Sequence, residues 1–418
     1  MTQIRILQGD VMKGLAILPD ESVQCVVTSP PYWGLRDYGV EGQIGLEKTP
    51  EEYVEKMVQV FREVRRVLRK GGTVWLNMGD CYGGSGKGPS ESLNKANPHS
   101  HEAAMVAPSS DLSGWNLKPK DLIGMPWRLV LALQADGWWL RSDIIWSKPN
   151  PMPESVRDRP TKSHEYLFLL AKDSRYFYDA DAIREEPKTT EKASWNGYGG
   201  QSWHDHADDL SGGQSQPKPN MAQVTHPAGR NRRTVWEIPT QPTPEAHFAT
   251  FPEALVEPCI KAGTSERGCC PKCGAPWQRV VEKGEPDEVH KKACGADSQG
   301  KYEGVSHKQD LLGKQTYTRF NARYKAAQIQ NASDVKRRIL NGMRERISTW
   351  EPDCQCNAGD PVPCVVLDPF AGSGTVAKVA RDLGRASISI ELSPVYVEIM
   401  RRRLRLDEQL FEMGADLK

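Results

Sequence analysis

The stretch Val365-Val-Leu-Asp-Pro-Phe-Ala-Gly-Ser-Gly-Thr375 decides the fold of this chain. Its apolar beginning, Cys364–Asp368, predicts a strand, and the glycine-rich turn leads into a predicted helix over Gly374–Leu383. A second strand over Arg385–Glu391 and a second helix over Pro394–Leu406 follow. This alternation of strand and helix is typical of a parallel sheet, so the sequence predicts an α/β fold.

The turn of this unit suits an adenosyl cofactor. A glycine-rich turn between strand and helix lets a ligand approach the backbone closely, and an acidic residue that closes the next strand, here Glu391, can hold ribose hydroxyls. The turn lacks both the GxGxxG spacing of dinucleotide sites and the Gly-Lys-Ser/Thr of nucleotide P-loops. On its glycines alone it would be an ordinary tight turn, but strand, turn, helix and Glu391 together favour a cofactor site.

A second motif, Ser29-Pro30-Pro31-Tyr32, ends an apolar run over 22–28. Two prolines at the end of a strand force the backbone out of the sheet. Their carbonyls can accept hydrogen bonds from an amino group, and Tyr32 or Trp33 can stack on a base. Accepting the protons of an aromatic amine would free its lone pair for attack on a sulfonium methyl, without a cysteine nucleophile. Taken alone, the motif fits a proline loop with a packed aromatic equally well.

Around these motifs, hydrophobic periodicity predicts further regular structure. Gly71-Gly72 is expected to cap the helix over 50–69. Polar composition predicts a mobile loop over 83–118, and either a recognition loop or disorder over 184–232. Strands are expected over 4–10, 22–28, 73–77, 139–146 and 164–171, and helices over 11–18, 50–69, 124–135 and 252–261.

The two motifs together resemble those of the amino-methylating DNA methyltransferases. The catalytic motif precedes the cofactor motif along the chain, as in the permuted β group of that family. Gly9-Asp10 is similar to the family's adenine-contacting acidic turn, and His247–Leu255 to the segment that packs on the methionine end of the cofactor. Further likeness lies in Thr28–Tyr38, Ile145–Asn150, Ser163–Phe168 and Asp368–Thr375.

The resemblance implies a permuted Rossmann-like, S-adenosylmethionine-dependent methyltransferase fold with inserted recognition and zinc-binding segments. It implies an enzyme that moves a methyl group from S-adenosylmethionine to the exocyclic amine of a flipped-out base in double-stranded DNA. The implied catalytic residues are Ser29, Pro30, Pro31 and Tyr32. The implied cofactor-binding residues are Asp10, Asp368, Pro369, Phe370, Gly372, Gly374, Thr375 and Glu391.

The first residue of the Pro-Pro-Tyr motif bears on which base is methylated. In this family a serine there is commoner among N4-cytosine enzymes, and aspartate or asparagine among N6-adenine enzymes. Ser29 therefore favours N4 of cytosine, with N6 of adenine as the alternative. A hydroxyl donates as well as accepts, whereas a carboxylate only accepts.

The cysteines are clustered late in the chain, with seven of the ten between Cys269 and Cys364. In a reducing compartment such clusters indicate a metal before a disulfide. Cys270 and Cys273 have the CxxC spacing of a zinc knuckle, and a second close pair, Cys354 and Cys356, follows about eighty residues later. Four thiolates could bind one structural zinc ion, which would hold both ends of an insertion to the rest of the fold. The alternatives are unliganded thiols, or one ligand from Cys269 or Cys294. The expected metal ligands are Cys270, Cys273, Cys354 and Cys356.

Composition restricts the remaining choices. The chain of 418 residues is 38% hydrophobic and contains no apolar run of membrane-spanning length. Its first residues lack the features of an export or transit signal, so we expect a cytoplasmic protein. The net charge of +1 gives no global argument for a polyanionic partner, and DNA affinity would come from local patches, of which the basic stretch Lys308–Arg346 is one candidate. Arg36, Asp37, Arg157 and Arg159 either contact DNA or order their loops.

These observations predict one methyltransferase core with inserted segments. The catalytic half would be 1–183, the target-recognition region 184–240, the cofactor half 241–263 with 358–418, and the cysteine-bearing insertion 264–357. The enzyme would be either a solitary modification enzyme or the partner of a separate cognate restriction nuclease, and it could form a homodimer. The alternatives are RNA or protein amides as the substrate, and a non-catalytic zinc-bearing nucleic-acid-binding protein with a decayed methyltransferase fold.

Overall fold

The computed structural model describes residues 3–35, 39–83, 118–185, 230–241, 251–282 and 347–406. The chain divides into two compact units, of which the first comprises 1–185, 231–278 and 352–418, and the second 186–230 and 279–351. Within the described ranges, no helix is both long enough and apolar enough to cross a membrane.

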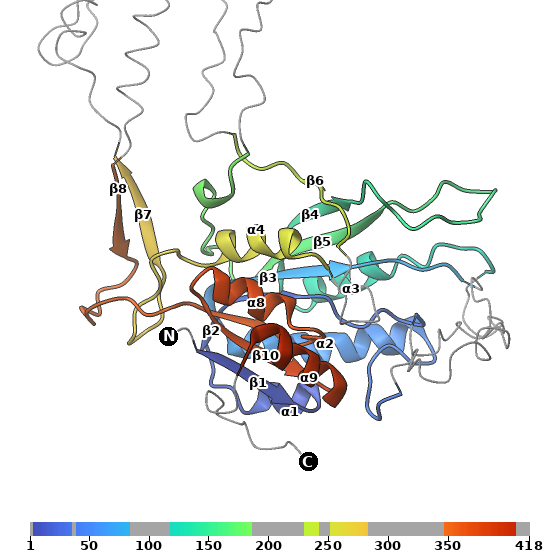
Figure 1. The fold of residues 1–418 in the computed structure, drawn as a ribbon, viewed down its shortest axis with the longest axis horizontal. Coiled ribbons are helices and arrows are strands. Elements are labelled where there is room, and N and C mark those ends of the chain that lie inside the picture. The colour runs from blue at the N-terminus through green and yellow to red at the C-terminus, as the bar shows by residue number, and fades with distance from the viewer. Residues whose placement is uncertain are drawn as a thin grey trace, which may run out of the picture. The chain divides into compact units, whose positions relative to one another are not determined.

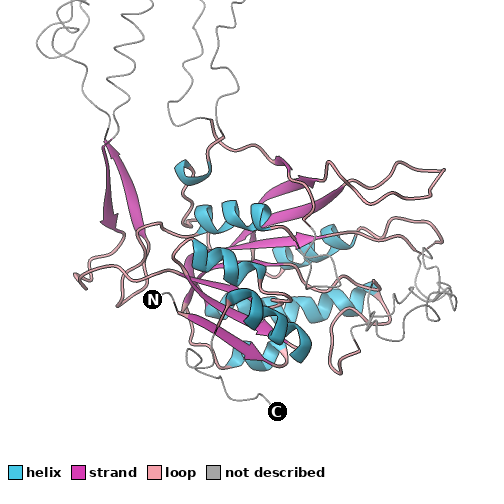
Figure 2. Cartoon of the chain, in the orientation of Figure 1, coloured by secondary structure: helices cyan, strands magenta, loops and turns pink. Residues whose placement is uncertain are grey.

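An eight-stranded sheet with the order β1-β10-β9-β2-β3-β5-β4-β6 forms the centre of the first unit (Figures 1 and 2). The first five strands of this order are mutually parallel, β5 runs antiparallel to both β3 and β4, and β6 is parallel to β4. The strands are β1 Ile4–Gln8, β2 Val23–Thr28, β3 Leu68–Met78, β4 Trp139–Ser147, β5 His164–Ala171, β6 Val235–Glu237, β9 Val365–Asp368 and β10 Ala386–Glu391.

Helices cover both faces of this sheet. One face carries α1 Val11–Ala16, α2 Pro50–Val67 and α3 Met125–Ala135, and the other carries α4 Glu253–Gly263, α8 Thr375–Asp382 and α9 Pro394–Leu404. Strand β2 is buried along its whole length, with Val26 in the core under α2 and Cys25 and Val27 in the core under α4 and α8. Burial on both faces is why this strand reads as a continuous apolar run.

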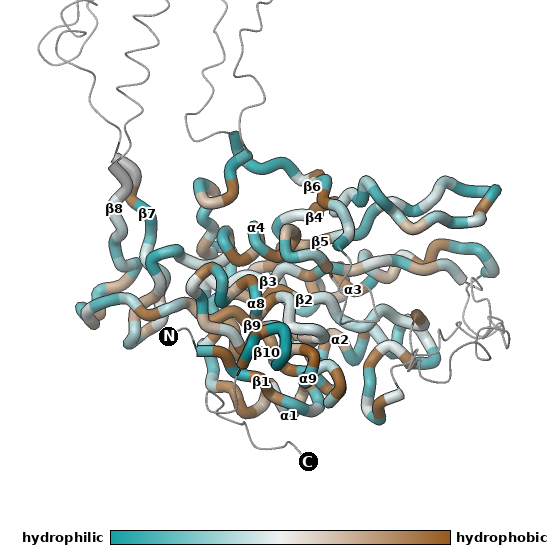
Figure 3. Tube along the Cα trace, viewed as in Figure 1, coloured by the Kyte–Doolittle hydropathy of each residue, from teal (hydrophilic) through white to brown (hydrophobic). Residues whose placement is uncertain are grey.

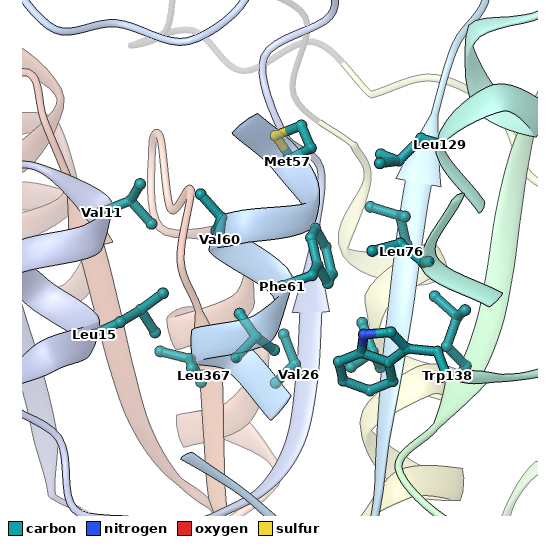
Figure 4. Close-up of a cluster of buried hydrophobic side chains, with 14 of the residues drawn as sticks. Val11, Leu15, Val26, Met57, Val60, Phe61, Leu76, Leu129, Trp138 and Leu367 are labelled. Carbon is teal, nitrogen blue, oxygen red and sulfur yellow. The ribbon is translucent and has the colours of Figure 1, made fainter. Parts of the chain in front are cut away.

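Helix α2 is the main packing element of its face. Pro50 begins the helix, and the Thr49 side chain accepts from the Glu52 amide at 3.1 Å, which caps it. Figure 4 shows Val60 and Phe61 among side chains from α1, α3 and the sheet. The ring of Phe61 meets that of Trp138 edge to face at 6.3 Å between centroids.

The sheet topology collects the ends of many elements at one edge. The carboxyl ends of β1, β10, β9, β2 and β3 share that edge because these strands are parallel. The register pairs Met78 with Tyr166 and Trp146 with Glu165, so the beginning of β5 and the end of β4 lie at the same edge. Ligands of open α/β sheets bind outside the carboxyl ends of the strands.

The predicted α/β class is confirmed, and the predicted strands and helices of the first unit are all present, most with ends shifted by one to three residues. The expected cap at Gly71-Gly72 is wrong, because α2 ends at Val67 and β3 begins at Leu68 and runs through both glycines. A Cβ on Gly72 would lie 2.6 Å from Leu68 Cδ1, so close packing accounts for a glycine there. Strand β6 was not predicted.

The cysteine-bearing stretch contains two unpredicted strands, β7 Trp277–Glu282 and β8 Ile347–Pro352, which pair as a separate two-stranded sheet. The residues between them, 283–346, lie outside the described part of the chain, and so does most of the expected loop over 83–118. The same holds for residues 186–229 of the expected recognition region.

Candidate active site

A pocket of about 330 Å³ lies along the carboxyl edge of the sheet. Its wall contains every residue of the Ser29–Tyr32 motif and most of the residues expected to hold the cofactor, so the topology brings together two motifs that are far apart in the sequence. Of the expected site residues, Asp10, Ser29, Pro30, Pro31, Tyr32, Pro369, Phe370, Gly372, Thr375 and Glu391 line the pocket, while Asp368 and Gly374 do not.

Glu391 organises one end of this pocket. The two oxygens of its carboxylate accept from two backbone amides, Gly372 N at 2.7 Å and Ser393 N at 2.8 Å. Burial raises the pKa of this carboxyl, and the two amides oppose that shift. The turn after β9 is therefore tied directly to the end of β10.

Asp10 lies beside Glu391, because the Gly9 amide donates to the Glu391 carbonyl at 2.9 Å. The Asp10 side chain caps α1 by accepting from the amides of Met12 and Lys13 at 3.0 and 3.1 Å. One of its oxygens, Oδ1, makes both contacts. This cap fixes the direction of a carboxylate on the pocket wall.

Asp368 is fully buried behind the pocket wall. Its Oδ1 accepts from Thr28 Oγ1 at 2.7 Å and from the Phe370 amide at 3.1 Å, which ties the end of β9 to the end of β2. Its Oδ2 is buried and has no hydrogen-bond partner among the described residues. Burial raises the pKa of Asp368 to about 7, against the opposing effect of the bond from Thr28. Asp368 is thus placed to hold the two motifs together.

The turn after Asp368 leaves space for a ligand. Gly372 lines the pocket at φ +50°, and a Cβ built there would have no described atom within 4 Å, so a side chain would project into the free space. Gly374 has φ +79°, and its Cβ would lie 2.3 Å from Met400 Cγ, so helix packing accounts for this glycine. Arg403 donates to Ser373 and to Thr375 Oγ1, which holds the turn from its far side.

These observations fit an S-adenosylmethionine site. A free cradle at Gly372, a pocket-lining aromatic ring at Phe370 and two carboxylates at strand ends are what an adenosyl group requires. Of the segment His247–Leu255, residues 247–250 lie outside the described part of the chain, and Phe251 lines the pocket.

Tyr32 lies at the other end of the pocket, and its hydroxyl is held by polar side chains. It donates to Glu165 Oε2 at 2.8 Å and approaches Asn77 Oδ1 at 3.3 Å and Ser29 Oγ at 3.4 Å. Burial, followed by the charge of Glu165, raises the pKa of Tyr32 well above its usual value. Tyr32 is therefore a neutral hydrogen-bond donor, and the orientation of its ring is fixed.

The neighbours of Tyr32 differ in whether they are free to contact a substrate. Trp33 is 1% exposed and donates to the Glu47 carbonyl at 2.9 Å, so of the two aromatic residues expected to offer stacking, Tyr32 lines the pocket and Trp33 does not. The Pro31 carbonyl accepts from the Tyr53 hydroxyl at 2.9 Å. No described backbone amide donates to the Pro30 carbonyl, which leaves that oxygen as an acceptor beside Ser29.

Sequence reasoning assigned no role to two charged residues of the pocket, Lys148 and Glu165. Lys148 Nζ donates to Glu165 Oε1 and lies 4.3 Å from the centroid of the Trp146 ring, and less than a fifth of either charged side chain is exposed. The signal that could have found them was the family likeness of Ile145–Asn150 and Ser163–Phe168. That likeness did not say which side chains would meet Tyr32.

The four cysteines predicted to bind metal come together in the first unit. The sulfur atoms of Cys270, Cys273, Cys354 and Cys356 all lie within 4.8 Å of one another. Zinc–sulfur bonds of roughly 2.3 Å in a tetrahedron place the sulfurs roughly 3.8 Å apart, so the cluster has the size of a zinc site. Cys269 is outside this set, and its thiol instead donates to the Pro363 carbonyl at 3.8 Å, while Cys294 lies outside the described residues.

The geometry of the pocket agrees with the sequence relationships of the chain. The DNA methylase family of the N6/N4 type matches residues 23–270 and 361–402. These ranges contain the Ser29–Tyr32 motif, the turn after Asp368 and Glu391. The chain belongs to this family and is an S-adenosylmethionine-dependent DNA amino-methyltransferase.

Among its relatives, the type II methyltransferase M.Cfr9I of Citrobacter freundii is 47% identical over 259 residues, which cover 62% of this chain and 72% of the relative. The type II methyltransferase M.SfiI of Streptomyces fimbriatus is 31% identical over 412 residues, covering 93% and 88% of the two chains. A solved structure, the cytosine-N4-specific PvuII DNA methyltransferase, aligns over 97% of this chain and 88% of its own at 16% identity and a TM-score of 0.48.

Proposed function

We propose that this chain is a type II modification enzyme that methylates N4 of cytosine in duplex DNA. The observation that supports this most directly is the single pocket shared by Ser29–Tyr32 and the turn 369–375. Names of relatives such as M.Cfr9I and M.SfiI support the type II assignment.

In this proposal, one half of the pocket holds S-adenosylmethionine, which supplies an electrophilic methyl group. Glu391 and Asp10 hold the polar ends of the adenosyl group, and Phe370 packs on its adenine. Pro369, Gly372 and Thr375 shape the turn that lies against it. Asp368 and Gly374 act indirectly, because both support the turn from behind the pocket wall.

The other half of the pocket receives the flipped base. The Pro30 carbonyl and Ser29 Oγ accept the two amino protons, which directs the nitrogen lone pair away from the ring plane. Tyr32 stacks on the base, and Glu165 and Asn77 keep its ring in place through the hydroxyl. Pro31 contributes rigidity, since its carbonyl is bonded to Tyr53.

The preference for cytosine rests on Ser29. As the first residue of the motif it offers a hydroxyl rather than a carboxylate or carboxamide, and in the resembling family that choice is commoner in N4-cytosine enzymes. N6 of adenine stays the alternative, because both amines are planar and would meet the same acceptors.

Nucleoside analysis of host DNA tests this assignment. The chain is expressed in a bacterial host without DNA methyltransferases, and its DNA is hydrolysed and examined by mass spectrometry. We expect N4-methylcytosine with the natural chain, none with Ser29→Ala, and natural levels with Ser174→Ala, a surface serine distant from the pocket. N6-methyladenine instead would overturn the base assignment.

We also propose that the four-cysteine cluster holds a structural zinc ion. The two pairs flank residues 279–351 in the sequence, so the ion would close the base of that insertion. The backbone amides of Cys273 and Lys272 lower the pKa of the Cys270 thiol, as expected for a knuckle that stabilises thiolate. Metal analysis of the purified chain should give one zinc per chain, and markedly less for Cys354→Ser than for Cys81→Ser, whose thiol lies elsewhere.

The remaining expectations concern partners and location. Duplex DNA is the proposed substrate, with residues 184–240 as the target-recognition region and a separate cognate nuclease as the cellular counterpart, as the type II names of the relatives suggest. A cytoplasmic location agrees with a cluster of reduced thiols. A homodimer stays a prediction, which light scattering of the purified chain would test.

A further inference from the structure

The loop between β4 and β5, residues 148–163, extends beyond the sheet on the side where the parallel strands end (Figure 1). We call it the β4–β5 arm. It is mainly hydrophilic (Figure 3), but it carries Met152, which is 87% exposed. Every other exposed large apolar side chain recorded among the described residues is at most 66% exposed. An apolar side chain held this far into solvent indicates a contact with a binding partner.

Met152 lies in the sequence Pro149-Asn-Pro-Met-Pro153, so prolines flank it on both sides. Each proline fixes its own φ and restricts the residue before it. A segment that is stiff before binding loses little conformational entropy when it inserts into a partner. The arm therefore presents Met152 on a preorganised support.

The base of the arm is anchored at two points. The Asn150 side chain makes reciprocal bonds with the Thr240 backbone, accepting from its amide at 3.0 Å and donating to its carbonyl at 3.5 Å. The Lys148 amide donates to the Ser163 carbonyl at 2.8 Å, which closes the neck. The first pair of bonds holds the arm to the segment after β6, which lines the pocket, and the second joins the two ends of the arm.

The returning limb of the arm is also held. Glu154 accepts from Arg159 at 2.7 Å and from the Lys162 amide at 3.2 Å, and Arg159 lies 3.9 Å from the centroid of the Tyr82 ring. Arg159 therefore orders the arm, which is one of the two roles that the sequence left open for it. Arg157, by contrast, is exposed and has no partner among the described residues, so its side chain is available to a ligand.

The arm begins at the pocket itself. Lys148 at its base lines the pocket, and Met152 is four residues further on, so it can lie at most about 14 Å from Lys148. A flipped base stays attached to its own DNA backbone, so the gap that it leaves in the duplex lies close to the pocket. The arm therefore keeps Met152 on the side of the molecule where that gap would lie.

We infer that Met152 is a wedge that enters the base stack of the DNA at the target position, while Arg157 contacts a backbone phosphate beside it. This inference rests on the proposed function, because it requires a base that leaves the duplex. Apolar wedges unstack neighbouring bases in other DNA-binding proteins, and arginines neutralise phosphates without reading sequence. Met152 would stabilise the flipped state and is not a catalytic residue.

The test compares two duplexes that contain the recognition sequence, located beforehand from the methylated host DNA. In one duplex the target is paired, and in the other it faces an abasic site. Single-turnover methylation is measured for the natural chain, Met152→Ala, Met152→Leu and the control Leu131→Ala, which changes an exposed leucine on α3. We expect Met152→Ala to slow methylation of the paired target at least tenfold and of the abasic duplex less than twofold. Met152→Leu and Leu131→Ala should stay close to the natural chain.

An equal loss on both duplexes, or no loss on either, would overturn the wedge. Because the comparison uses whichever base accepts the methyl group, methylation of adenine would refute the base assignment and leave the wedge test intact. Fluorescence of 2-aminopurine beside the target gives a readout without turnover, and the natural chain should raise it more than Met152→Ala does. For Arg157→Gln, the slope of log affinity against log salt should fall by about one, with the rate at saturating DNA unchanged.

Discussion

Glu165 should act on methyl transfer through Tyr32. The Tyr32 hydroxyl is buried and donates to the Glu165 carboxylate at 2.8 Å, while its bonds to Asn77 and Ser29 are longer. Hydrogen bonds to charged groups contribute about 1.5–3 kcal/mol. If that free energy holds the ring in its stacking orientation, Glu165→Ala should lower the rate of methyl transfer roughly 10- to 150-fold.

The companion variants separate orientation from charge. Tyr32→Phe removes the hydroxyl from the same bond, so its effect should overlap with that of Glu165→Ala, and the double variant should be little slower than the slower single variant. Glu165→Gln keeps an oxygen that can accept from Tyr32 but loses the charge opposite Lys148, and we expect a loss of only a few fold.

Single-turnover transfer from labelled S-adenosylmethionine gives the rates, and calorimetry gives the cofactor affinity, which should be unchanged in these variants. Glu63→Gln provides the control, because Glu63 pairs with Arg66 on α2 outside the pocket. Multiplicative losses in the double variant would refute the coupling, since Glu165 would then act independently of Tyr32.

Three further predictions follow from contacts in and around the pocket. A Cβ on Gly79 would lie 2.7 Å from Tyr32 Cε2, so Gly79→Ala should lower the free energy of unfolding by about 1–3 kcal/mol in urea titrations and also reduce activity. The folded-state pKa of Asp368, about 7, exceeds its unfolded value, so its contribution to stability is complete below about pH 4 and is lost as pH rises to 7. In the natural chain, the free energy of unfolding should therefore fall by about a few kcal/mol between these pH values because of Asp368, and Asp368→Asn should lack this fall. An unchanged pH profile in the variant would contradict the raised pKa. Chelation of zinc should lower the melting temperature of the natural chain but not that of Cys354→Ser, and equal melting curves with and without chelator would contradict a structural metal.

Local sequence patterns predicted most of the core because its strands and helices are amphipathic or wholly apolar over their own length. The end of α2 was misplaced because Gly71-Gly72 is a strong local stop signal, whereas the observed β3 pairs with β2 and β5 on either side. Strand β6 has three residues and depends on its partner β4. No local pattern in so short a segment could have predicted it.

The candidate site was predicted where a compact motif carries it and missed where pairing between strands builds it. Ser29–Tyr32 and the turn after Asp368 are continuous in the sequence and were identified directly. Glu165 and Lys148 reach Tyr32 only because β5 and β4 are antiparallel additions to a parallel sheet. Asp368 was predicted to bind the cofactor, and its burial behind the pocket wall became visible only in three dimensions.

The most direct test of the central claim is a transfer assay with the purified chain, labelled S-adenosylmethionine and unmethylated duplex DNA, followed by mass spectrometry of the nucleosides. A pocket in which Ser29 and the Pro30 carbonyl receive the amine of a flipped cytosine predicts label in N4-methylcytosine, and its loss in Ser29→Ala. Label in N6-methyladenine, or in neither nucleoside, would contradict that claim.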